Sequence, residues 1–398
     1  MEPSTPAATA DPDVSRPPRS SWSHTIAPAL VIRGQGVWPE AIDAIQRLSQ
    51  RPLLLGRGQA TFPLRQQLLS QLREAGLAPG EAALRHDCCE EDLRRLRTEV
   101  ARSAREGAHG RAAAAEGPYD GVIAMGGGKV LDAGKLLAHR LGLPCVTVPT
   151  SAATCAGWTA LSNIYTSNGA FVEDVGLARC PELLVFDHDL VRQAPPRTLI
   201  SGMADAMAKW YEASVSSGQS SDGLVQQAVQ QARLLRDLML LEGAQALEHP
   251  GSQAWARVAE GAALTAGLIG GLGGARCRTV AAHAVHNGLT QLPATHSLLH
   301  GEKVGFGILV QLRLEEVVGG SRLAGQARQQ LLDVFRALGV PCTLADLGLA
   351  EATLSDLQQV VEHACRDSSD LHHLPFPVTV QDVLAALVST TTQTQPVA

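Results

Sequence analysis

Short apolar runs alternate with helical patterns through the first half of the chain. Apolar runs predict strands at residues 51–56, 120–125, 145–148 and 183–186. Polar and apolar residues at helical spacing predict helices over about 62–74 and over 131–141. Strands and helices that alternate at this spacing are typical of βαβ units, so we expect a parallel sheet in this half.

The second half changes character after Pro195 and Pro196. Apolar residues then recur at helical spacing and predict helices at 198–214, 223–243, 254–270, 301–318 and 322–338. We therefore expect an α/β domain over residues 25–193 and an all-α domain over 194–398, with a boundary near Gln193. Residues 1–24 are rich in Pro, Ser, Thr and Ala, which predicts a disordered tail.

Composition and charge narrow the class of protein. The 398 residues carry a formal net charge of −6 without a basic stripe, so we expect no nucleic-acid partner. No apolar run reaches the roughly 18 residues that a membrane span needs, and the tail lacks an apolar signal segment. The eight cysteines form neither a disulfide framework nor a CxxC pair, which is typical of reduced thiols in a cytoplasmic protein.

Three segments carry candidate chemistry. Gly126, Gly127 and Gly128 separate a predicted strand from a predicted helix, and a turn without Cβ atoms lets a phosphate approach the helix N-terminus. A plain tight turn is the alternative. Asp205 is a lone carboxylate in an apolar helical stretch, and residues 282–307 hold four of the 13 histidines. Histidines in apolar surroundings either hydrogen-bond within the core or ligate a metal.

The order of these motifs carries a family resemblance. GGGKVLDAGK at 126–135, PTSAATCAGWTALS at 149–162, GMAD at 202–205, HAVHNG at 283–288 and HGEK at 300–303 resemble the glycerol dehydrogenase group of the iron-containing alcohol dehydrogenase superfamily. The resemblance covers roughly residues 32–387. It implies a Rossmann-like nucleotide-binding domain, an all-α metal-binding domain, the architecture of dehydroquinate synthase, and an active site in the cleft between the domains. It also implies a homo-oligomer.

The resemblance assigns residues to a metal and to a nicotinamide cofactor, NADP or NAD. It implies that Asp205, His283 and His300 bind one divalent metal, which is zinc in the glycerol dehydrogenases and iron in some relatives. One carboxylate and two imidazoles leave coordination positions open for a substrate and suit Zn²⁺ or Fe²⁺. The cofactor-binding candidates are Gly56, Arg57, Gly126, Gly127, Gly128, Lys129, Val130, Thr150, Thr154, Thr159, Leu161 and Tyr165.

Two further residues are candidates for catalysis. His286 follows His283 by three residues and shares its helix face, so it would either relay a proton or hydrogen-bond to a metal ligand. Cys155 stands where glycerol dehydrogenases have an aspartate that helps to bind polyol hydroxyls. The thiol lacks the carboxylate's charge and its strong acceptors, which favours an anionic substrate. The runs at 154–158, 208–213 and 280–286 resemble a hydroxycarboxylate dehydrogenase branch, which reduces 2-oxo acids to 2-hydroxy acids. A small buried side chain is the alternative for Cys155.

Arg57 is the second departure from the family pattern. NAD enzymes of this family usually have an acidic residue after this strand, whereas here the strand ends in Leu55-Gly56-Arg57-Gly58. An arginine would attract the 2′-phosphate of NADP, so we expect NADP to be tolerated or preferred. A solvated Arg57 and use of both cofactors is the alternative.

These observations predict a metal-dependent, NAD(P)-linked oxidoreductase that acts on a small molecule, either a 2-hydroxy acid or a polyol. Glycerol dehydrogenase proper is the alternative. A dehydroquinate synthase-like lyase is disfavoured, because segments 155–162 and 283–299 hold no Lys or Arg for a phosphorylated substrate. A catalytically silent nucleotide-binding protein is disfavoured by the intact Asp205, His283 and His300.

Overall fold

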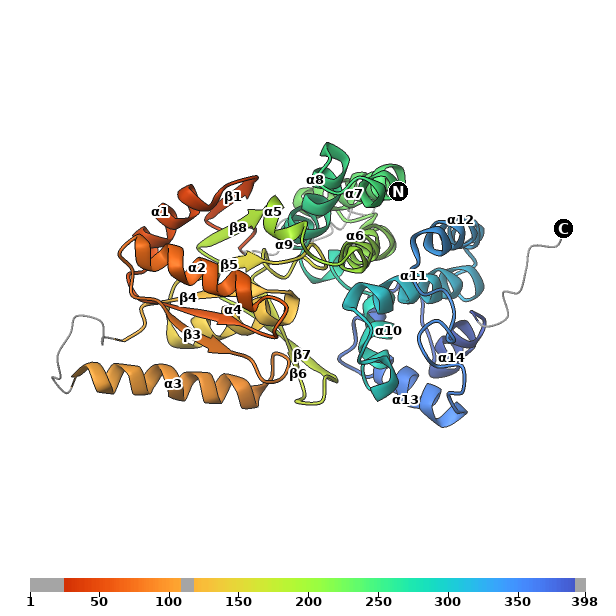
Figure 1. The fold of residues 1–398 in the computed structure, drawn as a ribbon. Coiled ribbons are helices and arrows are strands. Elements are labelled where there is room, and N and C mark those ends of the chain that lie inside the picture. The colour runs from red at the N-terminus through yellow and green to blue at the C-terminus, as the bar shows by residue number, and fades with distance from the viewer. Residues whose placement is uncertain (1–24, 109–117, 391–398) are drawn as a thin grey trace, which may run out of the picture.

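The computed structural model describes residues 25–108 and 118–390, so the tail predicted for 1–24 lies outside the described residues. Figure 1 shows a sheet with helices on both faces, followed by a group of helices. The strands are β1 (Leu30–Gly34), β2 (Pro52–Gly56), β3 (Gly80–Ala83), β4 (Gly121–Gly126), β5 (Cys145–Pro149), β6 (Leu161–Tyr165), β7 (Phe171–Gly176) and β8 (Leu183–Asp187). The predicted fold class, a parallel α/β sheet half followed by a helical half, is confirmed.

Helices cover the sheet and make up the second half. Those of the first half are α1 (Trp38–Leu48), α2 (Phe62–Glu74), α3 (Glu90–Ala108), α4 (Gly128–Leu141) and α5 (His188–Val191). Those that follow are α6 (Pro196–Ser217), α7 (Gly223–Glu248), α8 (Gln253–Glu260), α9 (Ala266–Gly273), α10 (Ala281–Leu289), α11 (His300–Val317), α12 (Arg322–Leu338), α13 (Leu354–Ala364) and α14 (Val380–Val388). In the described chain, no helix combines the length and hydropathy that crossing a bilayer requires.

The sheet is parallel, with strand order β1-β8-β5-β4-β2-β3. Residues along each strand alternate between two cores. In β2, Leu54 packs with α1 and α2, whereas Leu53 and Leu55 pack on the side of α3 and α4. Strands β2, β4, β5 and β8 are buried throughout, which is why each reads as a continuous apolar run.

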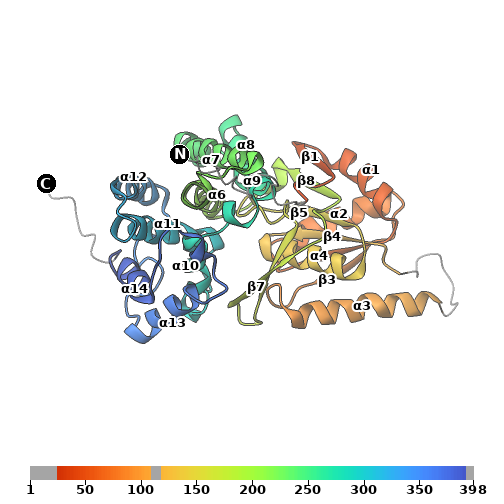
Figure 2. The same ribbon diagram turned by 180° about the vertical axis from the view of Figure 1, so that it is seen from behind.

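The hydrophobic pattern of the sequence did not predict the two edge strands or one hairpin. β1 and β3 lie at the two edges and are only partly buried, so their apolar residues form no clear run. β6 and β7 form a separate antiparallel hairpin. Figures 1 and 2 place this hairpin between the sheet and the helices α10 and α13. It thus lies where the two halves meet.

The helix predicted over 254–270 is wrong as a single element. It is divided into α8, a π-helical turn at Gly261–Thr265, and α9. The wider turn keeps the backbone continuous, so the apolar spacing on either side gives no sign of the interruption. Ala266 and Gly270 of α9 line the cavity described below.

The two halves share one core. Leu184 and Phe186 of β8 belong to the same apolar cluster as Met203 and Met207 of α6 and Trp255 of α8. Buried apolar surface between the halves fixes their relative position, because separating them would expose these side chains to water. A second cluster joins α10, α11, α13 and α14.

Candidate active site

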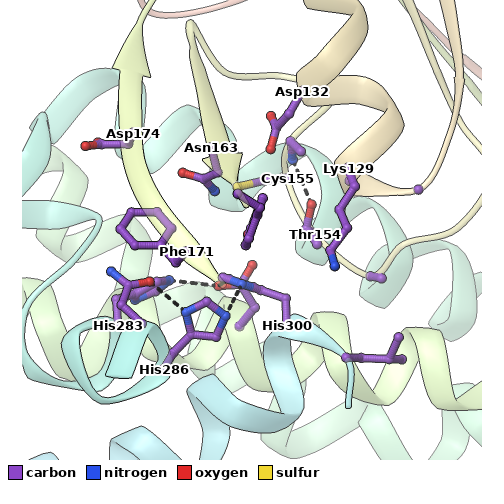
Figure 3. Close-up of a pocket in the computed structure, with 18 of the residues that line it drawn as sticks. Lys129, Asp132, Thr154, Cys155, Asn163, Phe171, Asp174, His283, His286 and His300 are labelled. Carbon is purple, nitrogen blue, oxygen red and sulfur yellow. Dashed lines mark hydrogen bonds and ion pairs between the residues drawn. The ribbon is translucent and has the colours of Figure 1, made fainter. Parts of the chain in front are cut away.

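A cavity of about 630 Å³ lies between the two halves. Its walls come from the loops after β2, β4 and β5, from the β6–β7 hairpin, and from α6, α9, α10 and α11. In parallel sheets, ligands bind outside the carboxyl ends of the strands. Figure 3 shows His283, His286 and His300 on one side of this pocket, and Lys129, Asp132 and Cys155 on the other.

The cavity brings together most of the residues predicted from the sequence. Those in its walls are Arg57, Gly126, Gly127, Gly128, Lys129, Val130, Thr154, Cys155, Thr159, Leu161, Tyr165, Asp205, His283, His286 and His300. Gly56 and Thr150 are not among them. A side chain at Gly56 would collide with Arg65, and Thr150 is buried, with its backbone N–H donating to Gly126 O at 3.1 Å. Both residues shape the strand ends beneath the cavity.

Three side chains converge on one point in a manner that fits a metal ion. Asp205 lies on α6, His283 on α10 and His300 at the start of α11. Asp205 Oδ1 is 3.4 Å from His283 Nε2 and 3.6 Å from His300 Nε2, and one ligand atom of each residue lies within 4.8 Å of the others. Gly301 allows this approach, because Ser201 O fills the space a side chain would need.

Each histidine is oriented by its other ring nitrogen. His283 Nδ1 lies 2.6 Å from Glu212 Oε2, and Glu212 Oε1 accepts bonds from the backbone N–H groups of His283 and Val280. Glu212 is fully buried. A carboxylate accepts the Nδ1 proton, which leaves the Nε2 lone pair of His283 facing Asp205.

His300 is oriented by a second histidine. Its Nδ1 lies 2.9 Å from His286 Nε2, and His286 Nδ1 lies 2.9 Å from Asn287 Oδ1. Because an amide oxygen only accepts, His286 carries its proton on Nδ1 and accepts from His300 through Nε2. The Nε2 lone pair of His300 therefore also faces Asp205. The three residues present one carboxylate oxygen and two imidazole lone pairs, which is a donor set for Zn²⁺ or Fe²⁺.

Charge is concentrated around these ligands. Burial alone would raise the pKa of Asp205, but the nearby Lys209 ammonium holds that pKa well below its ordinary value. Lys209 Nζ lies 3.4 Å from Asp205 Oδ1, and this attraction outweighs burial and raises the pKa of Lys209. Burial, with His300 nearby, keeps the pKa of His286 well below its ordinary value. Asp205 is thus ionised and His286 neutral near pH 7.

The N-terminus of α4 faces the same cavity. Gly127 precedes the helix in extended backbone, and no side chain caps the free N–H groups of the first turn. A Cβ at Gly127 would meet no atom within 4 Å, whereas one at Gly126 would press on Val130. Open space in front of unpaired N–H groups at a helix N-terminus suits a phosphate.

The carboxylate beside Arg57 comes from the segment after the neighbouring strand β3, not from β2, which Arg57 follows. Asp87, which follows β3, forms ion pairs with both Arg57 and Lys129. Burial raises the pKa of Asp87, but these two cations outweigh it and lower the pKa overall. Arg57 is therefore not simply solvated, and its charge is shared with Asp87.

Lys135 and Asp132 form a buried ion pair on the sheet side of the cavity. Lys135 Nζ lies 3.1 Å from Asp132 Oδ1 and donates to Thr159 and Leu161, so this pair connects α4 to the start of β6.

Cys155 lines the cavity, and burial raises the pKa of its thiol, which is thus neutral near pH 7. His296 Nε2 lies 2.8 Å from Thr290 O, a contact that orients a turn.

Glu212 and Lys209 were missed from the sequence, although a signal was present. Asp205, Lys209 and Glu212 follow one another at i, i+4 and i+7 along the buried part of α6. Three charged residues on one face of a buried helix need partners, because burying an unpaired charge is costly. That spacing could have indicated that all three serve one site.

Comparisons with known proteins show which proteins the chain resembles. The family model "Iron-containing alcohol dehydrogenase" matches residues 28–188. The chain is 50% identical to an uncharacterised oxidoreductase of Synechocystis over 96% of each chain. It is 37% identical to hydroxycarboxylate dehydrogenase A of Escherichia coli, over 67% of this chain and 73% of that one.

A solved structure shares the whole architecture. The crystal structure of a probable glycerol dehydrogenase from Sinorhizobium meliloti superposes with a TM-score of 0.79 at 27% identity. The match covers 92% of this chain and 97% of that one. The sheet, the helical half and their arrangement are therefore common to both proteins.

Proposed function

The chain belongs to the iron-containing alcohol dehydrogenase family, and from this premise we propose that it is a metal-dependent, NAD(P)-linked oxidoreductase that interconverts a small alcohol and its carbonyl compound. One observation carries the proposal. The cavity that holds Asp205, His283 and His300 is also the cavity into which the N-terminus of α4 opens. A metal ligand set and a dinucleotide phosphate site in one cavity suit hydride transfer.

Asp205, His283 and His300 would hold the metal, because two lone pairs and a carboxylate oxygen face one another there. Bound between them, Zn²⁺ or Fe²⁺ would act as a Lewis acid toward the substrate oxygen. In the oxidative direction the alcohol carbon gives a hydride to NAD(P)⁺ and the hydroxyl releases a proton. Glu212 and His286 keep the two imidazoles correctly oriented and protonated on Nδ1.

We assign His286 a positioning role rather than that of a proton relay. Its Nε2 accepts a bond from His300 Nδ1, and its Nδ1 donates to Asn287. Both ring nitrogens are thus engaged, so a relay would require His286 to break the bond that orients a metal ligand.

Gly127 and Gly128 would hold the phosphates of the cofactor, and Thr159 and Leu161, which line the same cavity, would contact its nicotinamide half. NADP and NAD both remain candidates. Arg57 favours the 2′-phosphate of NADP, but Asp87 shares its charge and weakens the attraction.

The substrate is a 2-hydroxy acid or a polyol. A neutral Cys155 in the cavity wall offers no strong acceptor to polyol hydroxyls and does not carry the negative charge that an aspartate at this position would direct at a carboxylate. The likeness to a hydroxycarboxylate dehydrogenase supports an acid, and the likeness to a probable glycerol dehydrogenase supports glycerol. A lyase like dehydroquinate synthase is less favoured, because the segments 155–162 and 283–299 hold no Lys or Arg, so the cations of the cavity wall come from other segments and do not form one dense basic cluster there.

One assay panel tests the proposal. NADH or NADPH is offered with 2-oxoglutarate, 2-oxobutanoate or dihydroxyacetone, and NAD or NADP with glycerol, each with and without a chelator. We expect turnover of at least one pair, with loss in chelator and recovery on adding Zn²⁺ or Fe²⁺. If no pair shows chelator-sensitive turnover, the oxidoreductase assignment is wrong.

A further inference from the structure

Arg278 is a cation in the active-site wall that the metal and cofactor sites do not use. It lies between α9 and α10 and lines the cavity that holds Asp205, His283 and His300. Its Nε is buried and has no hydrogen-bond partner among the described residues. A buried donor without an acceptor is costly, so a guanidinium held in this way is suited to an acceptor that arrives with a ligand.

The backbone of Arg278 is held by the metal site itself. Arg278 O accepts a bond from Lys209 Nζ at 3.3 Å, and the same ammonium lies 3.4 Å from Asp205 Oδ1. Two residues further on, Val280 N donates to Glu212 Oε1 at 2.7 Å. Lys209 and Glu212, which contact Asp205 and His283, therefore also fix the backbone on either side of Thr279 and with it the position of Arg278.

The side chain of Arg278 has a fitted place in the wall. Its Cγ and Cδ lie against Gly270 of α9, and a Cβ at that glycine would approach them to 2.7 and 2.8 Å. Gly270 lines the cavity as well. The aliphatic part of Arg278 is thus packed, which limits the conformational entropy that binding through its guanidinium would cost.

The guanidinium of Arg278 is only weakly paired within the described residues. It forms one ion pair, with Asp174 of β7, in which Nη2 and Oδ2 are 4.0 Å apart and 53% of the Asp174 side chain is exposed. By contrast, Arg197 donates to both oxygens of Glu302 at 2.5 and 2.7 Å. An exposed pair at 4.0 Å contributes little, so an incoming carboxylate can take the free donors of Arg278.

The neighbouring charges leave the wall able to accept an anion. Arg366 reaches β7 from the other side, with Nη1 3.4 Å from Val172 O. Asp370 also lines the cavity, and Thr279 and His373 already engage its carboxylate. Two arginines, Arg278 and Arg366, thus share this wall with Asp174 and Asp370. The charge of the buried Lys209 is already paired with Asp205.

We propose that Arg278 binds a carboxylate of the substrate and so selects hydroxy acids and oxo acids over polyols. This inference rests on the proposed oxidoreductase function. A guanidinium offers a carboxylate two parallel N–H donors, and such charge-assisted bonds are stronger than those to a neutral hydroxyl. Arg278 acts on substrate choice, while Asp205, His283 and His300 serve the reacting oxygen.

Two matched pairs of substrates test Arg278. Hydroxypyruvate and dihydroxyacetone differ only in a carboxylate that replaces a hydroxymethyl group, as do pyruvate and hydroxyacetone. Arg278→Gln should lower kcat/KM for the two acids by about 10- to 100-fold, the usual effect of losing a bond to a charged group. The neutral ketones should change less than about threefold. Arg278→Lys should recover part of the loss, since it keeps the charge but not the fork.

Arg276→Gln is the control, because Arg276 lies in the same loop but is exposed. Equal losses on acids and neutral ketones in Arg278→Gln, or no loss at all, would overturn the inference while the oxidoreductase function stands. A wild type that reduces only neutral ketones would also overturn it.

If the wild type turns over neither these ketones nor any substrate of the first panel, the proposed function fails and a binding measurement decides the inference. Calorimetric titration of the zinc-loaded protein with oxamate, an unreactive analogue of pyruvate, should then show weaker binding in Arg278→Gln than in Arg276→Gln. Equal oxamate affinities in the two variants would overturn the role of Arg278.

Discussion

At the scale of the residue, each metal-facing histidine depends on a partner that never touches the metal. Glu212 accepts from three donors, namely His283 Nδ1 and the backbone N–H groups of His283 and Val280. His286 takes the corresponding position behind His300. Such partners fix the tautomer of a ligand and thereby determine which nitrogen offers its lone pair.

Glu212→Gln should weaken metal binding without unfolding the protein. Glutamine has one oxygen, so one of the three donors would face an NH₂ group instead of an acceptor. We expect metal affinity to fall about 10- to 100-fold, as is usual when such a partner is lost. Competition with a chromophoric chelator measures it. Glu242→Gln on α7, an exposed ion-pair position, is the control; equal affinity in both variants would show that Glu212 has no such role.

Arg57 and Asp87 together should set the preference between NADP and NAD. Arg57→Asp should raise the KM for NADPH much more than that for NADH, because it places a negative charge near the 2′-phosphate. Asp87→Asn should lower the KM for NADPH, because it releases Arg57 from its ion pair. Steady-state kinetics with both cofactors measure these changes. Parallel changes for the two cofactors would mean that Arg57 does not face the 2′-phosphate.

At the scale of the element, α4 presents backbone N–H groups to the cavity, whereas α6 presents charged side chains to it. α4 offers the free N–H groups of its first turn, so its contribution depends on the absence of side chains at Gly127 and Gly128. α6 is buried over most of its length and contributes charged side chains from one face. A helix end suits a phosphate, whereas a helix face suits a metal with its surrounding partners.

Gly127→Ala should separate cofactor binding from folding. Gly127 has φ −78°, which alanine adopts freely, and a Cβ there meets no atom within 4 Å. The melting temperature should stay within about 2 °C, while the KM for the dinucleotide rises about tenfold because the methyl group keeps the phosphate away. Gly176→Ala, which also adds a methyl group in open space, is the control. An unchanged KM would exclude a phosphate at this turn.

Glu315 on α11 should make stability depend on pH. Burial, opposed by a bond from Gln311, raises the pKa of Glu315 to about 7. Between the ordinary pKa of 4.5 and this value the folded protein binds more protons than the unfolded chain, so stability falls as pH rises. Glu315→Gln should remove this loss, of the order of 2 kcal/mol. Urea unfolding at pH 5 and pH 8 measures it, with the exposed Glu351→Gln as control. Equal pH dependence in wild type and Glu315→Gln would contradict the prediction.

At the scale of the whole molecule, the metal ligands join three helices of the second half to a cavity completed by the first. Asp205, His283 and His300 come from α6, α10 and α11. A metal that binds the folded chain and not the unfolded one adds its binding free energy to stability.

Removing the metal should therefore lower the melting temperature. A metal at 100 times its Kd stabilises the folded state by about 2.7 kcal/mol, which corresponds to a few degrees in a chain of this size. Calorimetry with Zn²⁺ and with a chelator measures the difference. His300→Ala should abolish it, whereas His249→Ala, an exposed histidine, should not. A difference that survives in His300→Ala would place the metal elsewhere.

The sequence predicted several strands and helices correctly because the burial of each is regular along its length. β2, β4, β5 and β8 are buried on both faces, and α2 and α12 have the predicted bounds because each has one apolar face and clear ends. The edge strands, the β6–β7 hairpin and the π-turn left no periodic signal. Asp87 was missed for a different reason: its partners Arg57 and Lys129 lie 30 and 42 residues away.

The sequence by itself determined the two-part fold, the glycine turn and the set of metal ligands. These depend on local periodicity and on motifs whose residues lie close together or in a recognisable order. Only the tertiary structure decided how those residues are used: that Glu212 orients His283, that Asp87 shares the charge of Arg57, and that Arg278 keeps an unpaired Nε donor among the described residues. Hydrogen bonds and charge act over a few ångströms of space, and the neighbours they join are separated by tens of residues along the chain.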